Sequence, residues 1–162
     1  MGRYTATITW KRNGAVFTDG RYSRAHRWQF DGGIEVSASA SPHVVPLPFS
    51  VEAAVDPEEA FVAALVSCHM LWFLSIAATQ GFIVEGYRDE ATGIMASNAE
   101  GKQAMTEVTL RPRVTFIGEK RPTEAEHKSL HDEAHERCVI SNSVKTDVRC
   151  DARDVTNGEV QV

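Results

Sequence analysis

The chain has 162 residues, of which 43% are hydrophobic and 24% charged, and it carries a net charge of −5. This length predicts a single domain over 1–162 with a sizeable core, and a polar, loosely held tail over 151–162. A mildly acidic chain without a basic cluster argues against nucleic acid as a partner. The first residues lack the layout of an export signal, so we expect a reducing cytoplasm. Three cysteines are too few for a disulfide scaffold and too widely spaced for a zinc pattern.

The first third of the chain predicts short strands and long loops. Residues 4–10 alternate between apolar and polar side chains, which indicates a half-buried strand, and residues 34–40 alternate in the same way. Between them, residues 21–30 are dense in arginine and aromatic side chains and are expected to form a loop before the second strand. Three prolines in 41–55 predict an extended loop, of a kind that is often functional.

The helix predicted over residues 57–80 is the most apolar part of the chain. Asp56 suits the N-cap, Pro57 the first helical position, and Gly81 the left-handed residue that ends a helix. Almost every side chain between them is apolar, so the helix is expected to be buried on all sides. Its uninterrupted apolar part is too short for a membrane span, which favours a core helix.

The second half of the chain predicts an α+β domain. Residues 82–88 could form a strand, and 105–116 give the strongest strand signal, with Pro112 at an edge or a bulge. A capping box at 123–126 opens a second helix that ends near residue 138, and a last strand covers 143–150. We therefore expect two central helices, about 57–80 and 123–138, covered by antiparallel sheets. One small sheet could hardly cover the first helix, so either a second sheet or a second subunit is needed.

Cys68 and Cys138 are the candidate reactive groups. Free cysteine is most often a small buried hydrophobe, and a reactive thiol needs a neighbouring cation or hydrogen-bond donor. Cys138 shares the apolar face of the second helix with Leu130 and Ala134. If the two helices pack together, the two thiols could approach within disulfide distance. Cys150, on the apolar face of the last strand, is interpreted as structural.

Glu58 and a nearby arginine could complete a site around Cys68. On one helix, Glu58 and Cys68 are about 15 Å apart along the axis, so they cannot bond directly. A long cationic side chain from elsewhere could contact both, and Arg21, Arg24 and Arg27 are the candidates.

The histidines predict no obvious catalytic group. His127, His131 and His135 form one stripe of the second helix, a spacing that can bind metal. Many acidic residues surround this stripe, so a solvated face is the favoured interpretation. His69 points about 100° away from Cys68 around the helix. A thiol-dependent hydrolase is disfavoured for this reason.

Several motifs together resemble those of the OsmC/Ohr family of thiol-dependent peroxidases. They are Asp56-Pro-Glu-Glu-Ala-Phe, Ser67-Cys68-His-Met and, about seventy residues after Cys68, Glu136-Arg-Cys138-Val-Ile-Ser-Asn-Ser. The resemblance covers roughly residues 4–150. The segment Tyr22-Ser-Arg24-Ala-His26-Arg-Trp28, followed by Asp31-Gly-Gly, is more similar to the OsmC-like branch than to the Ohr branch.

The resemblance implies a role for each of four residues. Cys68 would be the peroxidatic cysteine, Cys138 the resolving cysteine, and Glu58 the partner of a site arginine. We assign that arginine to Arg24, with Arg21 and Arg27 as alternatives. The family fold is an intertwined homodimer with its sites at the interface, which would also cover a helix that is apolar on every side.

The implied activity is a Cys-based peroxidase, an organic hydroperoxide reductase that needs no metal, flavin or haem. The substrate would be an alkyl or lipid hydroperoxide, and the reductant a dithiol, with a lipoyl protein as one candidate. The expected partners include neither nucleic acid nor membrane. The alternative is a non-catalytic dimeric domain that senses redox state or binds a hydrophobic ligand.

Overall fold

The computed structural model describes residues 1–152 and 154–156. The chain divides into two compact units, Met1–Ala60 and Phe61–Val162, which are described one at a time. The prediction of a single domain over 1–162 therefore stays a prediction. Of the tail that was expected to be loosely held, residue 153 and residues 157–162 lie outside the described residues.

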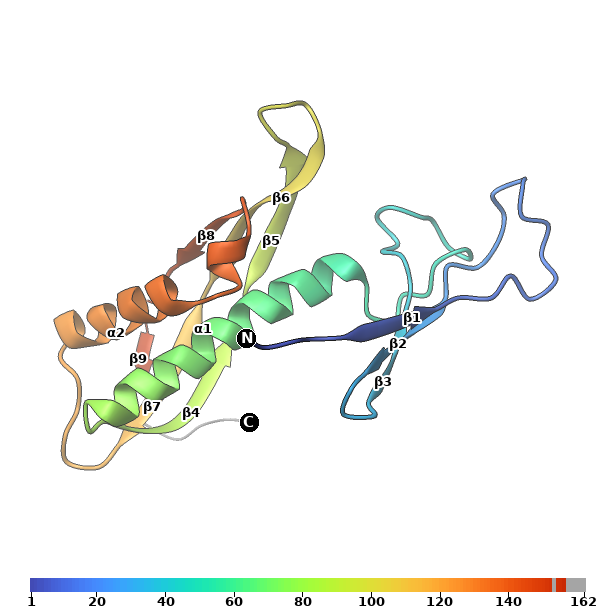
Figure 1. The fold of residues 1–162 in the computed structure, drawn as a ribbon. Coiled ribbons are helices and arrows are strands. Elements are labelled where there is room, and N and C mark those ends of the chain that lie inside the picture. The colour runs from blue at the N-terminus through green and yellow to red at the C-terminus, as the bar shows by residue number, and fades with distance from the viewer. Residues whose placement is uncertain (153, 157–162) are drawn as a thin grey trace. The chain divides into compact units, whose positions relative to one another are not determined.

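The first unit is built on a three-stranded antiparallel sheet (Figure 1). Its strands are β1 (Ala6–Thr9), β2 (His26–Phe30) and β3 (Glu35–Ala38). The two predicted strands are confirmed, but β2 was expected to be a loop, so Arg27 lies on a strand. All four residues of β1 are exposed, so the predicted half-burial is wrong for this chain. Within the first unit, residues 1–60, the only helical residues are 57–60, so no helix lies over this sheet to bury one of its faces.

Helix α1 spans Pro57–Thr79, close to its predicted limits. The Asp56 side chain accepts a hydrogen bond from the backbone N–H of Glu59 at 2.8 Å, which caps the first turn. Gly81 ends the helix with a φ of 79°. Both end signals that were identified in the sequence are thus confirmed.

Only one stripe of α1 is buried in this chain. The buried residues are Leu65, His69, Phe73, Ile76 and Ala77. On another side of the helix, Leu71 is 62% exposed, so the expected burial on every side is not reached. By length and composition α1 could cross a membrane, a property that it shares with the core helices of soluble proteins.

The second unit contains two three-stranded sheets. The first has the order β4 (Ile83–Asp89), β7 (Pro112–Ile117) and β9 (Asp154–Thr156), and the second β5 (Thr92–Ser97), β6 (Gln103–Leu110) and β8 (Asp147–Cys150). The predicted antiparallel pairing is confirmed for β4 with β7 and for β5 with β6. Strands β8 and β9 add two parallel pairs, with β6 and β7 respectively.

The single strand predicted over 105–116 is wrong. It is divided at Arg111 into β6 and β7, which belong to different sheets. Pro112 has no N–H to donate to a neighbouring strand. The N–H of Arg111 donates to the Asp89 carboxylate at 2.7 Å instead of to a strand. Two adjacent residues therefore direct the chain from one sheet into the next.

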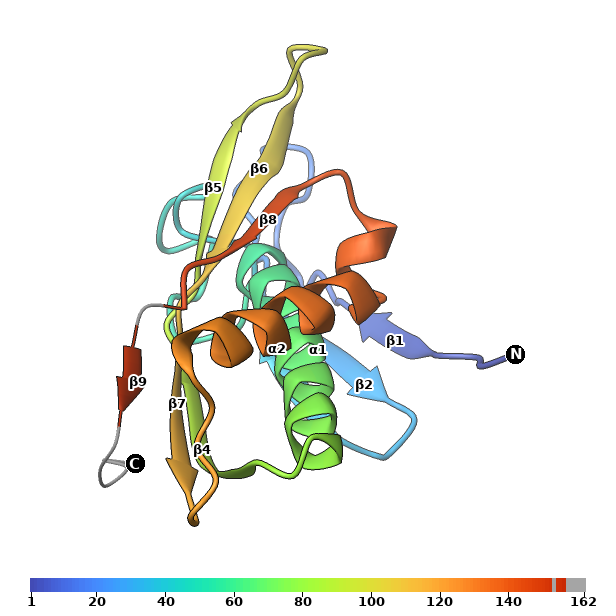
Figure 2. The same ribbon diagram turned by 90° about the vertical axis from the view of Figure 1, so that its left-hand side faces the viewer.

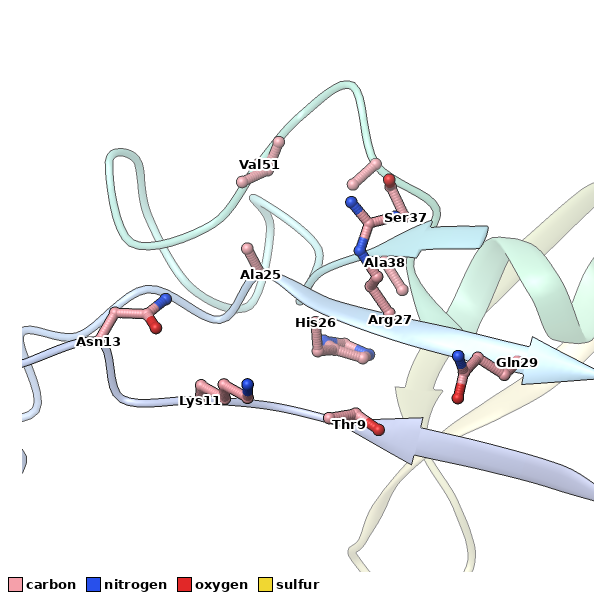
Figure 3. Close-up of a pocket in the computed structure, with 11 residues that line it drawn as sticks. Thr9, Lys11, Asn13, Ala25, His26, Arg27, Gln29, Ser37, Ala38 and Val51 are labelled. Atoms are coloured by element: carbon pink, nitrogen blue, oxygen red, sulfur yellow. The ribbon is translucent and has the colours of Figure 1, made fainter. Parts of the chain in front are cut away.

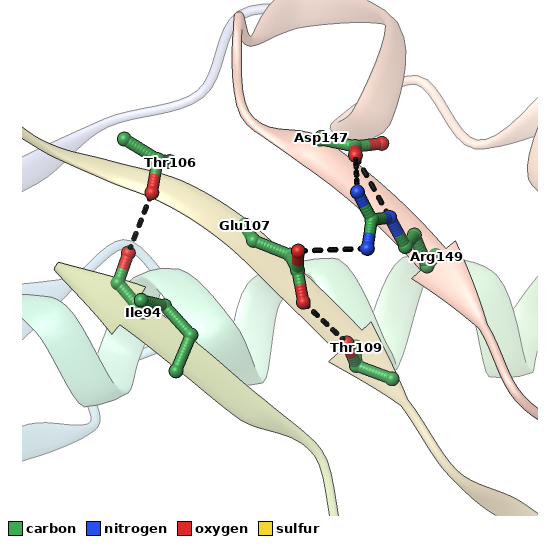
Figure 4. Close-up of polar contacts among 6 residues, drawn as sticks. All are labelled: Ile94, Thr106, Glu107, Thr109, Asp147 and Arg149. Atoms are coloured by element: carbon green, nitrogen blue, oxygen red, sulfur yellow. Dashed lines mark hydrogen bonds and ion pairs between the residues drawn. The ribbon is translucent and has the colours of Figure 1, made fainter. Parts of the chain in front are cut away.

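Strand β8 is held against β6 by backbone and side-chain contacts (Figure 4). The register pairs Val108 with Val148 and Leu110 with Cys150. On the exposed side, the Arg149 guanidinium lies 2.8 Å from the Glu107 carboxylate. An exposed pair of this kind contributes at most about 1 kcal/mol, so the register depends mainly on the ladder and the apolar side chains.

Helix α2 spans Glu124–Arg137 and begins with the predicted capping box at Thr123. Figure 2 shows it lying across α1. Their shared core consists of Phe73, Ile76, Ala77, Phe82, Val114, Phe116, Leu130 and Ala134. The sequence left open whether the two helices pack together, and the shared core shows that they do.

The prediction of a solvated histidine stripe on α2 is wrong. His127 and His131 are each only 3% exposed. His127 lies three residues before Leu130, and His131 lies three residues before Ala134, which places both histidines on the core face of the helix. The surrounding acidic residues occupy the other faces, and His135, one turn further on, is only partly buried.

Candidate functional site

Cys68 and Cys138 come together where α1 and α2 pack. Cys68 is partly exposed in the middle of α1, and Cys138 is fully buried at the C-cap of α2. Cys138 lies near enough to Cys68 to raise the pKa of the Cys68 thiol. A disulfide between them requires the two Cα atoms to lie within about 7 Å of each other.

The turn after Cys138 surrounds both sulfur atoms with N–H groups. The backbone N–H of Ser141 donates to the Cys138 sulfur at 3.4 Å. The backbone N–H groups of Val139 and Ile140 lie near Cys68 and act to lower the pKa of its thiol. Donors of this kind favour a negatively charged sulfur or sulfenate oxygen.

Side chains in the same turn close the end of α2. The Asn142 amide donates to the carbonyl oxygen of Glu136 at 2.9 Å. The hydroxyl of Ser143 donates to the carbonyl oxygen of Val139 at 2.7 Å. These bonds satisfy carbonyl groups that a helix end leaves free, and they hold the turn in place. The Ser-Asn-Ser sequence after Cys138 therefore has a local structural role.

Burial raises the pKa of the Cys68 thiol, and the nearby Cys138 thiol raises it further. The N–H groups of Val139 and Ile140 oppose this shift. No cation is among the causes of the shift. A low-pKa thiolate would therefore need a positive group in addition to the residues that surround Cys68 here.

Glu58 lies in the first turn of α1. Its Oε2 atom is buried and has no hydrogen-bond partner among the described residues. A buried carboxylate oxygen without a donor is costly, and a guanidinium would satisfy it. Because α1 is continuous, the separation of about 15 Å between Glu58 and Cys68 along the helix remains.

The candidate arginines are all engaged within the first unit. The Arg24 guanidinium donates to the carbonyl oxygens of Gly20 and Tyr22 and lies 3.9 Å from the centre of the Tyr22 ring. Arg21 lies over Phe49 at 5.9 Å. The structure therefore does not bring Arg24 to Glu58, and the choice of arginine stays a prediction.

Arg27 has a different setting from the other two arginines. It lies 3.8 Å from the Glu35 carboxylate and lines a pocket over the first sheet, together with Lys11 and His26 (Figure 3). Its position on β2, away from the loop of Arg24, distinguishes it from the preferred candidate.

A second cluster, which the sequence interpretation missed, contains His69, His127, His131 and Cys150. The His69 Nε2 atom lies 3.0 Å from His131 Nδ1, and His131 Nε2 lies 3.3 Å from His127 Nε2. Cys150 Sγ lies 3.9 Å from His69 Nε2. The available signal was the four-residue spacing of His127 and His131 on the same face as Leu130 and Ala134.

All four groups in this cluster have shifted pKa values, and burial lowers that of His127. Burial lowers the pKa of His69 to about 4 and that of His131 to about 2, with a further contribution from neighbouring histidines. Burial raises the pKa of Cys150 to about 12, and nearby carboxylates act in the same direction. At neutral pH the imidazoles are therefore uncharged and the thiol is protonated.

The chain matches a family model described as OsmC-like protein over residues 50–153. No curated protein sequence matches it. Its structure is similar to that of an OsmC-like protein of unknown function from Vibrio cholerae, with a TM-score of 0.92 and 57% identity, covering 94% of this chain and 99% of that one.

More distant structures share the fold. One is an organic hydroperoxide resistance protein from Elizabethkingia anophelis, with 16% identity, a TM-score of 0.66 and 98% of both chains covered. Another is the organic hydroperoxide resistance protein OhrB of Bacillus subtilis, with 17% identity, a TM-score of 0.63, and 94% of this chain and 98% of that one covered. From the matching family model and the 57% identical relative, we conclude that this chain belongs to the OsmC family.

Proposed function

We propose that this protein is a thiol-dependent peroxidase that reduces organic hydroperoxides to alcohols. The observation that carries the proposal is the closeness of the Cys68 and Cys138 thiols in an OsmC-family fold. Organic hydroperoxide resistance proteins with the same fold support the choice of substrate class. The site would comprise Cys68, Cys138, Glu58 and Arg24.

In the proposed reaction, the Cys68 thiolate attacks one peroxide oxygen. The O–O bond breaks, the departing alkoxide takes a proton to become an alcohol, and Cys68 becomes a sulfenic acid. The Arg24 guanidinium would stabilise the thiolate and the peroxide, while Glu58 would hold the guanidinium in place. The unpartnered buried oxygen of Glu58 supports such a role.

Cys138 would then resolve the sulfenic acid. Its sulfur attacks Cys68, the sulfenic oxygen leaves as water, and a Cys68–Cys138 disulfide forms. A dithiol reductant, for which a lipoyl protein is one candidate, restores both thiols by exchange. The fixed turn at Ser141 supports this step, because it keeps the Cys138 sulfur against α1 while α2 stays in place.

An alkyl or lipid hydroperoxide fits the surroundings better than hydrogen peroxide. Leu71 follows Cys68 by one helical turn and is 62% exposed, and Val139 follows Cys138 directly and is 59% exposed. Both are available to an apolar group, either of a substrate or of a second subunit.

We also propose that the protein acts as a homodimer in the cytoplasm, without nucleic acid or membrane as a partner. The incompletely covered α1 supports this assembly, as do the exposed Ile8 and Ile34 of the first unit. Sedimentation analysis is expected to give twice the mass of one chain. A monomer at micromolar concentration would contradict the dimer but not the reaction.

The decisive experiment measures turnover of cumene hydroperoxide with a dithiol donor in Cys68→Ser. We expect the rate to fall to the uncatalysed level, whereas Ser75→Ala, an exposed change on the same helix, retains activity. In the wild type, one equivalent of peroxide should produce a Cys68–Cys138 disulfide that is detectable by mass analysis. Undiminished turnover in Cys68→Ser would eliminate the proposal.

The alternative function is a non-catalytic dimeric domain for redox sensing or hydrophobic-ligand binding. The raised pKa of the Cys68 thiol favours it, because a protonated thiol reacts slowly with peroxide. It predicts that stoichiometric peroxide forms the disulfide, or no bond at all, without multiple turnover. The same peroxide titration therefore separates the two functions.

A further inference from the structure

The buried cluster of His69, His131 and Cys150 contains side chains that commonly bind metal ions. His69 comes from α1, His131 from α2 and Cys150 from β8. One ligand atom from each residue can be chosen so that all three lie within 4.8 Å of one another. Imidazole nitrogen and thiolate sulfur are the ligands that zinc prefers in proteins.

The distances between these atoms are close to those of a tetrahedral site. With zinc–nitrogen and zinc–sulfur bonds of usual length, two nitrogen ligands are about 3.4 Å apart, and nitrogen and sulfur about 3.6 Å. Here His69 Nε2 and His131 Nδ1 are 3.0 Å apart, and His69 Nε2 and Cys150 Sγ are 3.9 Å apart. Two of the three separations are therefore within a few tenths of an ångström of the tetrahedral values, and the ligand atoms of all three residues lie within 4.8 Å of one another.

The surroundings of His131 orient it as a ligand. When Nδ1 faces the ion, Nε2 carries the proton and can donate to His127 Nε2, 3.3 Å away. The His131 ring also stacks on Phe73, with a centroid distance of 4.2 Å. Metal-binding histidines usually have such a partner on the second nitrogen. His127 is thus a positioning residue.

The position of Cys150 is fixed by strand pairing. It lies opposite Leu110 in the β6–β8 ladder, and the next residue, Asp151, donates its N–H to the carbonyl oxygen of Leu110 at 2.9 Å. The sulfur is therefore held against His69 by the backbone of an established sheet. A metal ion here would connect both helices to this sheet.

Charge and access also favour a cation. The carboxylates of Asp89, Asp132 and Asp151 are near enough to Cys150 to raise the pKa of its thiol. A cavity lined by His127, His131, Asp132, Cys150 and Asp151, among others, leads to the cluster. An ion can therefore enter from this side, and a water molecule can occupy a fourth coordination position.

We propose that His69 Nε2, His131 Nδ1 and Cys150 Sγ bind one zinc ion, with a fourth position open to the cavity. On binding, the Cys150 thiol loses its proton to solvent and forms a sulfur–zinc bond, while both imidazoles remain neutral. This site is separate from the Cys68–Cys138 pair. It ties α1, α2 and β8 together, so its occupancy stabilises the fold.

The test uses cobalt(II) as a spectroscopic probe in a Cys68→Ser/Cys138→Ser background. The chain has three cysteines, so Cys150 is then the only thiol that can bind the ion. We expect one cobalt per chain, a thiolate-to-cobalt absorption band, and its loss when one equivalent of zinc is added. Zinc should also raise the melting temperature of the chelator-treated protein and release about one proton per chain at neutral pH.

Single changes identify the ligands in the same background. Cys150→Ala should remove the thiolate band, and His69→Asn and His131→Asn should each weaken zinc binding strongly. His127→Asn should weaken it about 10- to 100-fold, because it changes only the orienting contact. His135→Asn, a partly buried histidine on the same helix, should bind zinc as tightly as the parent. Circular dichroism without metal establishes that each variant is folded.

Two outcomes overturn the proposal. One is the absence of a thiolate-to-cobalt band in the Cys68→Ser/Cys138→Ser protein. The other is zinc binding that persists unchanged in Cys150→Ala and His131→Asn. If the background variant fails to fold, X-ray absorption of the zinc-loaded wild type decides the matter. Two nitrogens and one sulfur support the proposed site, whereas two sulfurs indicate binding by the Cys68–Cys138 pair and contradict it.

Discussion

Cys68 and His69 are neighbours on α1, yet they belong to two different sulfur-containing clusters. Cys68 faces a second thiol and the N–H groups of a turn, and it is partly exposed. His69 faces His131 and Cys150 and is 1% exposed. Consecutive residues of a helix point about 100° apart, so Cys68 faces Cys138, a pair suited to thiol exchange, whereas His69 faces Cys150, a thiol suited to metal coordination. The partner of each thiol, and not burial alone, determines its chemistry.

The largest expected effect concerns Phe73, which supports the imidazole side of this comparison. Phe73 is fully buried and stacks on His131. Phe73→Ala should lower the free energy of unfolding by about 3–5 kcal/mol, because it removes a large ring from the core. Urea denaturation measures this change. Ser75→Ala, an exposed control on α1, should remain within about 0.5 kcal/mol of the wild type.

Cys138→Ser should separate the two steps proposed for the thiol pair. The first oxidation of Cys68 should still occur, because that step uses only the Cys68 sulfur. Multiple turnover should fall on the order of 100-fold, since no nearby thiol condenses with the sulfenic acid. Stopped-flow measurement of the first turnover and a steady-state assay distinguish these rates. An equal loss in both would contradict the assignment of Cys138 as the resolving cysteine.

Arg24→Met tests whether a cation completes the thiol pair. At pH values below its pKa, a thiol gains thiolate about tenfold per pH unit. Burial raises the pKa of Cys68, so its reactivity should increase as the pH rises. If Arg24 lowers this pKa in the functional assembly, Arg24→Met shifts the profile of first-turnover rate to higher pH, by roughly one unit for a single nearby charge.

Arg27→Met is the matched comparison for Arg24→Met, because Arg27 pairs with Glu35 on the strand face. It should leave the pH profile unchanged. A shift in Arg27→Met without one in Arg24→Met would assign the site arginine to Arg27. The absence of any shift in both variants would remove these two residues from the proposed site.

The smallest effect should come from the cap of α2, the helix that both clusters share. The Thr123 hydroxyl accepts from the N–H of Glu126 at 3.2 Å. Thr123→Ala should lower the free energy of unfolding by about 1 kcal/mol, whereas Thr123→Ser keeps the oxygen and most of the stability. The first-turnover rate of Cys68 should not change, because Cys138 lies at the opposite end of the helix. A rate change in folded Thr123→Ala would indicate coupling along α2.

The helix ends and the proximity of the two thiols could be predicted from local signals. Asp56, Gly81 and Thr123 act through neighbouring backbone groups, so the sequence alone specifies their roles. The approach of Cys68 to Cys138 follows from two helices packing by their apolar faces. Both inferences depend on short-range chemistry or on a clear helical period.

The parts that the sequence did not predict depend on contacts between distant residues. In the sequence, Arg111 fits the pattern of one long strand. Its N–H instead donates to the carboxylate of Asp89, 22 residues earlier, and this contact could not be identified from the pattern. The charged neighbours of His127 and His131 suggested solvent, although His131 contacts His69, 62 positions earlier in the chain, and His127 contacts His131. The partner of Arg24 could not be identified for the same reason.

The buried stripe of α1 also restricts how this gene can change. Leu65, His69 and Phe73 are spaced by four residues and must all face inward. Inserting one codon between Cys68 and His69 would rotate every later residue of the helix by about 100° relative to Cys68. Such an event would move the histidine and the aromatic ring out of the core while leaving the thiol in place. We therefore expect natural variation in this segment to proceed by substitution, with length changes confined to loops such as residues 98–102.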